Sequence, residues 1–170
     1  MTITDVRGRR ASWRPDRGDA WVVESLCMAG GVAHVDQTSA GLHLRVCDDR
    51  DQPGCGTEAW LLEDGRVAVR CAAAPPALLV TQGASRLVPS LPGGRDTQAL
   101  VDGDLLVMCS AGALDHLPAG IGAVLGWGPR QLGASHPETL LERLMAEVDE
   151  GAALLARYRA PTADVTRHAQ

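Results

Sequence analysis

The stretch Gly103-Asp104-Leu105-Leu106-Val107-Met108-Cys109-Ser110-Ala111-Gly112-Ala113-Leu114-Asp115 contains five consecutive apolar residues between a polar turn and a run of small residues. Asp102-Gly103-Asp104 is typical of a turn. The uninterrupted apolar run Leu105–Cys109 is typical of a strand that is buried on both faces. We therefore expect Leu105–Cys109 to be a central strand of a sheet.

The residues before this stretch predict short strands separated by turns. Glu63-Asp64-Gly65 between Ala59–Leu62 and Arg66–Val69 predicts a hairpin, because Asp-Gly supplies the positive φ that a tight turn needs. Polar segments rich in Gly and Pro, Cys47–Gly56 and Ser90–Gln98, are expected to be loops. Apolar or alternating runs indicate the other strands, Trp21–Met28, Val32–Asp36, Leu42–Val46, Ala77–Thr81 and Arg86–Val88.

After Gly112 the apolar residues change from a strand period to a helical one. Leu140, Leu141, Leu144, Met145 and Val148 recur at helical spacing, and Ser135-His136-Pro137-Glu138 is typical of a capped helix start. The segment Ala152–Tyr158 is expected to extend or repeat this helix. The fold class predicted from these patterns is α+β, with an antiparallel β-sheet core and C-terminal helices.

Length and composition limit the classes of protein to which the chain can belong. Its 170 residues suit one domain, and 45% hydrophobic with 22% charged residues is the ordinary globular mixture. No apolar run is long enough to span a membrane, and the Arg-rich start leads into no apolar segment of a secretion signal, so we expect a cytoplasmic protein without a membrane partner. The net charge of −5 argues against a general nucleic-acid partner. The sequence lacks Lys, Asn and Phe, whose codons are AT-rich, which suggests a GC-rich bacterial source.

Two local features leave alternatives open. Five Arg residues lie within residues 1–17, which predicts either a solvated N-terminal arm or an arm that docks on an acidic partner. The cysteines at 27, 47, 55, 71 and 109 form no C-x-x-C pair, so we expect buried thiols, with a metal or nucleophilic site as the alternative. The predicted domain organisation is the arm 1–17, one domain 18–166 and a tail 167–170.

Residues 103–115 resemble a signature of the PPM-type metal-dependent serine/threonine phosphatases, in their SpoIIE-like bacterial branch. That signature has the form G-D-L-L-L-L-Y-T-D-G-V-T-E, and it aligns here without a gap. Ala72-Ala73-Ala74-Pro75-Pro76 resembles the family's A-G-H-P-P turn, and Ala163-Asp164-Val165-Thr166 resembles its closing D-D-V-T strand. Arg17-Gly18-Asp19 and the segment from Asp36 to Gly41 are similar to its G-G-D and D-x-x-G-H-G elements. The family's two long helices after the latter element are missing, so the resemblance implies a reduced PPM-phosphatase-like sandwich.

The resemblance implies a site for two Mn²⁺ or Mg²⁺ ions that activate a bridging water, and this chain departs from it. Ala111 stands where the family has the Asp of T-D-G, and Ala163 stands where it has the first Asp of D-D-V-T. Asp19 and Asp36 would be the only residual metal ligands, and the alternative for both is that they bind local backbone donors. Because hard divalent cations need several oxygen ligands, we predict no catalytic residues and no cofactor, with Mn or Mg needed only if activity survives.

The sequence is compatible with three functions. The first is a catalytically inactive phosphatase-like module that binds a regulatory protein in bacterial signalling of the sigma-factor or stress-response type. The second is a divergent metal-dependent phosphoprotein phosphatase. The third is a homo-oligomeric scaffold, because losing a helical layer should expose a sheet face of Val, Leu and Ala side chains that a second copy would cover. The expected partner is therefore a protein or a second copy in a homodimer.

Overall fold

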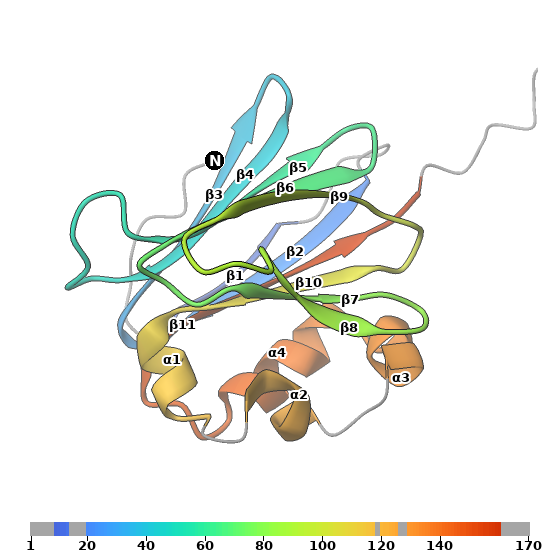
Figure 1. The fold of residues 1–170 in the computed structure, drawn as a ribbon. Coiled ribbons are helices and arrows are strands. Elements are labelled where there is room, and N and C mark those ends of the chain that lie inside the picture. Colours follow the sequence, from blue (N-terminus) through green and yellow to red (C-terminus); the bar gives the residue numbers. More distant parts are fainter. Residues whose placement is uncertain (1–8, 14–19, 118–119, 126–128, 161–170) are drawn as a thin grey trace, which may run out of the picture.

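The computed structural model describes residues 9–13, 20–117, 120–125 and 129–160. Two β-sheets pack face to face, and the described helices all lie on the outer side of one of them (Figure 1). We call the sheet that the helices cover the covered sheet, and the other the open sheet. This arrangement confirms the predicted α+β class with a largely antiparallel core.

The covered sheet has the strand order β1-β2-β11-β10-β7-β8, and all neighbours in it are antiparallel. Its strands are β1 (Arg9–Trp13), β2 (Trp21–Cys27), β7 (Ala77–Val80), β8 (Ser85–Val88), β10 (Leu105–Cys109) and β11 (Glu150–Tyr158). The prediction of Leu105–Cys109 as a central strand is confirmed, because β10 pairs with β11 on one side and with β7 on the other.

The open sheet has the order β3-β4-β5-β6-β9, again with antiparallel neighbours. Its strands are β3 (Ala29–Thr38), β4 (Gly41–Asp48), β5 (Gly56–Leu62), β6 (Arg66–Ala72) and β9 (Arg95–Ala99). The predicted hairpin is the β5–β6 connection, in which Gly65 has the positive φ of 77° that the turn requires. Only residues 49–55 separate β4 from β5, so the predicted absence of a helical pair there is confirmed.

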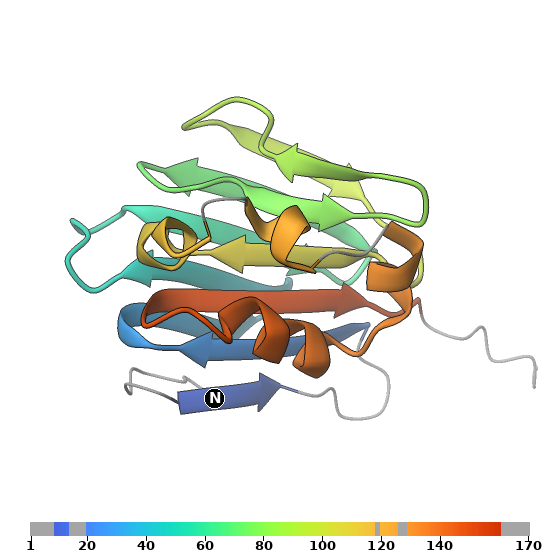
Figure 2. The same ribbon diagram turned by 90° about the horizontal axis from the view of Figure 1, so that it is seen from below.

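The four described helices lie beneath β2, β7, β10 and β11 (Figure 2). They are α1 (Ala111–Asp115), α2 (Gly120–Leu125), α3 (Pro129–Ala134) and α4 (Pro137–Met145). The helix α4 confirms the prediction from helical spacing, although its N-cap is His136, whose side chain accepts a hydrogen bond from the Glu138 amide at 3.3 Å. No described helix is long and apolar enough to cross a membrane.

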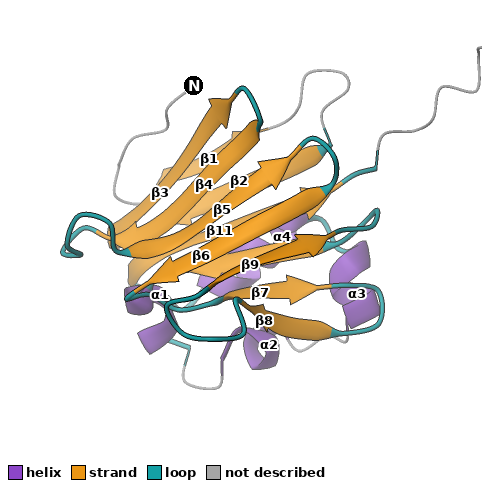
Figure 3. Ribbon diagram, turned by 45° about the horizontal axis from the view of Figure 1, so that its top comes forward, coloured by secondary structure: helices purple, strands orange, loops and turns teal. Residues whose placement is uncertain are grey.

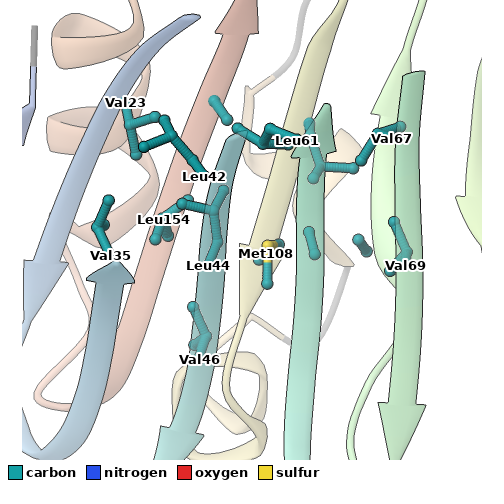
Figure 4. Packing of buried hydrophobic residues seen from close by; sticks show 14 of the residues in the cluster. Val23, Val35, Leu42, Leu44, Val46, Leu61, Val67, Val69, Met108 and Leu154 are labelled. Carbon is teal, nitrogen blue, oxygen red and sulfur yellow. The ribbon is translucent and has the colours of Figure 1, made fainter. Parts of the chain in front are cut away.

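Two apolar clusters share the strands β10 and β11. Alternate residues such as Met108 and Leu154 point between the sheets, where they meet Leu44 and Leu61 of the open sheet (Figure 4). The intervening residues point at the helices and pack against the apolar side of α4; these residues are Leu105, Val107, Cys109, Ala153 and Leu155. Burial on both faces explains why β10 has no polar residue at all.

Three sequence predictions are corrected by this architecture. Ala152–Tyr158 is strand β11, not helix, because its seven residues lie between β10 and β2 and are buried throughout. Residues 95–99 of the predicted loop are strand β9 at the edge of the open sheet. Residues 9–13 of the predicted N-terminal arm are strand β1, which pairs along its length with β2. The rest of that arm and the predicted strand at 163–166 lie outside the described residues.

The expected apolar face on the open sheet is also wrong. The strand β4 alternates strictly up to Val46, with Leu42, Leu44 and Val46 buried against the other sheet and His43 and Arg45 turned away from it. Neighbouring strands continue this pattern with Glu58, Trp60 and Arg70 on the outer side. The uncovered face is therefore polar and aromatic, so exposed Val, Leu and Ala do not require a second copy to cover them.

Candidate functional site

The ends of four strands meet at one corner of the sandwich, where the two sheets are joined. There β11 pairs in parallel with the start of β3 through Glu150 opposite Ala29 and Gly151 opposite Gly30. The register of β3 on β4 places Asp48 opposite Gly31, and β10 ends beside the start of β11. We call this corner the junction, and its residues are 30–31, 48–49, 110–112 and 150–151.

Ser110 fixes the end of β10 to the start of β11. It is 1% exposed and forms the N-cap of α1. Its hydroxyl oxygen accepts hydrogen bonds from the Ala113 amide at 3.3 Å and from the Ala152 amide at 3.0 Å. Its own amide donates to the Ala152 carbonyl at 2.9 Å. A single side chain therefore sets both the direction of α1 and its distance from β11.

Asp48 fixes the end of β4 to the same helix. Its Oδ2 accepts a hydrogen bond from the Gly112 amide at 2.8 Å, in the first turn of α1. A carboxylate near the N-terminus of a helix is stabilised by the exposed amides there. The other oxygen, Oδ1, is buried and has no hydrogen-bond partner among the described residues. Asp48 thus joins the open sheet to the covered one through half of its carboxylate.

Gly31 has no room for a side chain. A Cβ atom built on it would lie 2.0 Å from the carbonyl carbon and oxygen of Gly151 and 2.5 Å from the Ala152 amide nitrogen. The backbones of β3 and β11 cross at this point, and only a glycine allows such an approach. The contact between the sheets is therefore made by main chain where a larger residue would hold them apart.

Acidic side chains surround the junction. A Cβ atom on Gly30 would lie 3.3 Å from Glu150 Oε1 and 3.4 Å from Asp49 Oδ1, so these two carboxylates flank the turn into β3. Arg50 lies 3.7 Å from Glu150 and is largely exposed. Ala111 is exposed at the first position of α1 and brings only a methyl group to this acidic corner.

The residues that the sequence singled out as site residues do not come together here. Asp36 lies on β3 opposite His43, five residues beyond Gly31, which is about 16 Å along an extended strand. The structure therefore separates Asp36 from Ala111. Asp19 and Ala163 lie outside the described residues, so their predicted roles as a residual ligand and a lost ligand stay predictions.

Sequence reasoning missed Asp48, Asp49 and Glu150, although a signal for them was available. Asp48-Asp49 follows directly after the alternating strand Leu42–Val46, and Asp149-Glu150 precedes the apolar run of β11. Acidic pairs at strand ends are where cation sites are often built. The assignment of Ala152–Tyr158 to a helix concealed the second pair, because it moved the closing strand to residues 163–166.

Comparison with solved structures identifies the architecture. A structure of RsbX in complex with magnesium superposes with a TM-score of 0.59 over 93% of this chain and 100% of that chain, at 9% identity. The phosphatase domain of SpoIIE from Bacillus subtilis gives a TM-score of 0.43, with 97% and 91% of the two chains covered at 12% identity. The serine/threonine phosphatase PstP of Mycobacterium tuberculosis gives 0.45, with 94% and 97% covered at 10% identity. No family model matches the chain, and no curated protein matches it in sequence.

The chain has the PPM-type phosphatase fold. In this PPM fold the strand that follows the helices and pairs with β10 is β11. In the acidic pair Asp149-Glu150, Asp149 stands directly before this strand and Glu150 is its first residue. The described strand that ends beside α1 is β4, whose Asp48 lies at this corner, whereas Asp36 lies farther along β3.

The residues at the junction do not fit the pair of divalent ions that the PPM fold implies. Ala111 offers no ligand, Gly31 admits no side chain, and the Oδ2 atom of Asp48 is used by the Gly112 amide. Within the described part of the chain, no group of three or more His, Cys, Asp or Glu side chains is arranged to hold a metal ion. Two hard cations need more carboxylate oxygens than this corner directs at one point.

Proposed function

We propose that this chain is a non-catalytic, PPM-like signalling module that acts by binding a regulatory protein. The observation that carries the proposal is the hydrogen bond from the Gly112 amide to Asp48, at the strand-end corner where the PPM fold would place its ions. A side chain that would serve as a metal ligand is used there to hold two parts of the same chain together.

The surrounding substitutions favour the same conclusion. Removing carboxylates from a two-metal site removes both its affinity and its ability to clamp the attacking and leaving oxygens. Alanine at the exposed position 111 also adds no further negative charge to a corner that already holds Asp48, Asp49 and Glu150. The loss of metal-binding carboxylates and the alanine at position 111 are both expected in a chain that must fold but need not hydrolyse a substrate.

A regulatory partner is the natural role for such a module. The resemblance to the SpoIIE-like branch implies partners among the small proteins that control sigma factors. A chain that keeps the sandwich without the ions can still present a binding surface to them. Its net charge of −5 argues against nucleic acid as the partner, and we place its action in the bacterial cytoplasm.

Metal-dependent hydrolysis is the direct test of this proposal. The purified chain is assayed with p-nitrophenyl phosphate and a phosphoserine peptide, with and without Mn²⁺, and Mn²⁺ binding is measured by calorimetry. We expect no turnover above buffer and no tight binding at two sites per chain. The matched variants are Asp48→Asn and Asp36→Asn, of which only the first alters the junction.

A divergent phosphatase is the second candidate, and one observation favours it. Asp48 Oδ1 is buried and has no partner among the described residues, so a single cation could still recruit this oxygen. Turnover that depends on Mn²⁺, disappears in Asp48→Asn and survives in Asp36→Asn would establish this candidate and overturn the non-catalytic module.

A further inference from the structure

The outer face of the open sheet is the largest structural surface that the junction does not explain. Figure 3 looks onto it, with the helices behind the sandwich. The described helices all contact the covered sheet or its end, and none lies over the middle of the open sheet. The resemblance to the PPM family implies a helical pair in this part of the chain, and only residues 49–55 lie between β4 and β5.

One row of side chains crosses this face from edge to edge. Strand register places five residues opposite one another in turn, and they are His34, Arg45, Glu58, Arg70 and Arg95. The row carries three guanidinium groups and one carboxylate, although the whole chain has a net charge of −5. Glu58 pairs with Arg70 at 2.6 Å, which leaves the charges of Arg45 and Arg95 without a carboxylate in the row. Asp48 at the end of β4, with Asp49 and Asp51 in the loop that follows, limits the row on that side.

A tryptophan stands in the next row of the same face. Trp60 stacks on His43, with ring centroids 5.0 Å apart and an interplanar angle of 18°. The guanidinium carbons of Arg95 and Arg70 lie 5.2 Å and 6.0 Å from the Trp60 ring centroid. Trp and Arg are the residues that most often dominate binding energy at protein interfaces, and here they are ordered before any partner arrives.

We propose that this face is the docking surface for an acidic protein, bound through the exposed Arg70 and Arg95 around Trp60. The inference rests on the proposed function and adds the place and the charge of the partner. Carboxylates of a partner would complete the basic row by bidentate pairing with guanidinium groups. A second copy of this chain would instead bring one basic row against another, which like charges disfavour.

Nucleic acid fits the face less well than an acidic protein does. His43 lies on one neighbouring strand of Trp60 and Arg70 on the other, so both sides of the indole are occupied and no free ring face remains for a base. The negative net charge of the chain also opposes a polyanion at longer range. A folded protein with a local acidic patch avoids both obstacles.

The test uses defined probes, because the natural partner is not identified. A fluorescein-labelled 16-residue peptide of Glu and Leu is titrated by anisotropy at 150 mM salt, beside a labelled 16-nucleotide oligo-dT. The test variant is the double charge reversal R70E/R95E. The matched control is R50E/R86E, which makes the same change in net charge at two exposed arginines outside the row. Thermal melting confirms that both variants are folded.

We expect R70E/R95E to weaken peptide binding about tenfold or more and R50E/R86E to leave it within about twofold. Equal loss in both variants, tighter binding of oligo-dT than of the peptide, or no peptide binding by the wild type would each overturn the docking surface. These outcomes concern the docking surface alone. The proposed non-catalytic function is contradicted only if the Mn²⁺ assay shows turnover. Sedimentation at twice 17.9 kDa that R70E/R95E abolishes would assign the face to a second copy and likewise overturn the proposal.

Discussion

The strands β10 and β4 both lie in the interior of their sheets, yet their sequences differ completely in pattern. All five residues of β10 are buried, since the open sheet covers one face and the helices cover the other. The strand β4 buries Leu42, Leu44 and Val46 and leaves His43 and Arg45 half-buried on its outer side, because none of the described helices lies above it. A continuous apolar run thus indicates a strand covered on both faces, and alternation indicates a strand covered on one.

The comparison also shows how a PPM fold can lose a helical layer. An apolar sheet face left in water would cost free energy or attract a partner without selectivity. The open sheet instead presents a ladder of paired polar groups, in which Arg70 meets Glu58 and Trp60 meets His43. These polar and aromatic side chains let the face lie in water without a covering layer.

The largest expected effect is at the point where the two sheets touch. Gly31→Ala would place a Cβ atom 2.0 Å from the Gly151 main chain, where backbone rather than a flexible side chain must move. We expect a loss of more than about 4 kcal/mol in the free energy of unfolding, or no folded protein at all. Urea unfolding measures it.

Gly83→Ala is the control for that substitution. A Cβ atom at Gly83 has nothing within 4 Å, so we expect no measurable loss of stability there. If both variants unfold at the same urea concentration as the wild type, the sheets are not held at Gly31 in the way that the geometry requires.

A matched pair of leucines tests the difference between the two sheets directly. Leu155 on β11 is fully buried against the helices, whereas Leu62 at the end of β5 is only half-buried on the outer side. We expect Leu155→Ala to cost about 3 kcal/mol and Leu62→Ala less than about 1 kcal/mol. Thermal or urea unfolding gives both values. Equal losses would mean that the open face is covered in solution.

A smaller effect is expected from two ion pairs. One involves a buried carboxylate of the covered sheet, and the other is exposed on the open sheet. Glu24 on β2 has no side-chain exposure; Arg10 lies 3.8 Å from its carboxylate, and Ser12 donates to it at 2.5 Å. Arg10→Ala takes a cation away from this buried carboxylate and also breaks the ion pairs of Arg10 with Glu138 and Glu142, so it should cost about 2 kcal/mol. Arg70→Ala breaks the exposed pair with Glu58 and should cost less than about 1 kcal/mol. Unfolding midpoints that rank the other way would contradict the role given to β1.

The smallest effect concerns the turn that leads from the open sheet to the covered one. Asp104 is 3% exposed, and its Oδ2 accepts a hydrogen bond from the Val101 amide at 3.0 Å. Burial raises the pKa of Asp104 above its usual value. Because the folded state then holds the proton more tightly than the unfolded state, this residue favours folding below the unfolded pKa and loses that contribution as pH rises through the folded pKa.

Asp104→Asn keeps an acceptor for the Val101 amide and removes the titration. We therefore expect the variant to be as stable as the wild type at low pH and slightly more stable at neutral pH, by less than about 1 kcal/mol. Unfolding curves across the acidic range measure the difference. A wild-type chain that gains stability relative to Asp104→Asn as pH rises would contradict the sign of this argument.

Much of the fold was predictable because local chemistry decides it. The hairpin at Asp64-Gly65 follows from turn geometry, and α4 follows from the spacing of Leu140, Leu141 and Leu144. The segment Ala152–Tyr158 was misassigned because a short apolar run has no period, and only its position between β10 and β2 makes it a strand. The strand β9 was missed for the opposite reason, since its polar residues lie on an exposed edge.

The sequence by itself determined that β10 is a central strand and that a helical layer follows it. The tertiary structure alone decided that Asp48 rather than Asp36 reaches the end of β10, and that Gly31 closes on Gly151. Local patterns depend on residues a few positions apart, and these can be recognised along the chain. The junction joins residues more than a hundred positions apart, and their proximity depends on strand order and register, which only the packed sheets define.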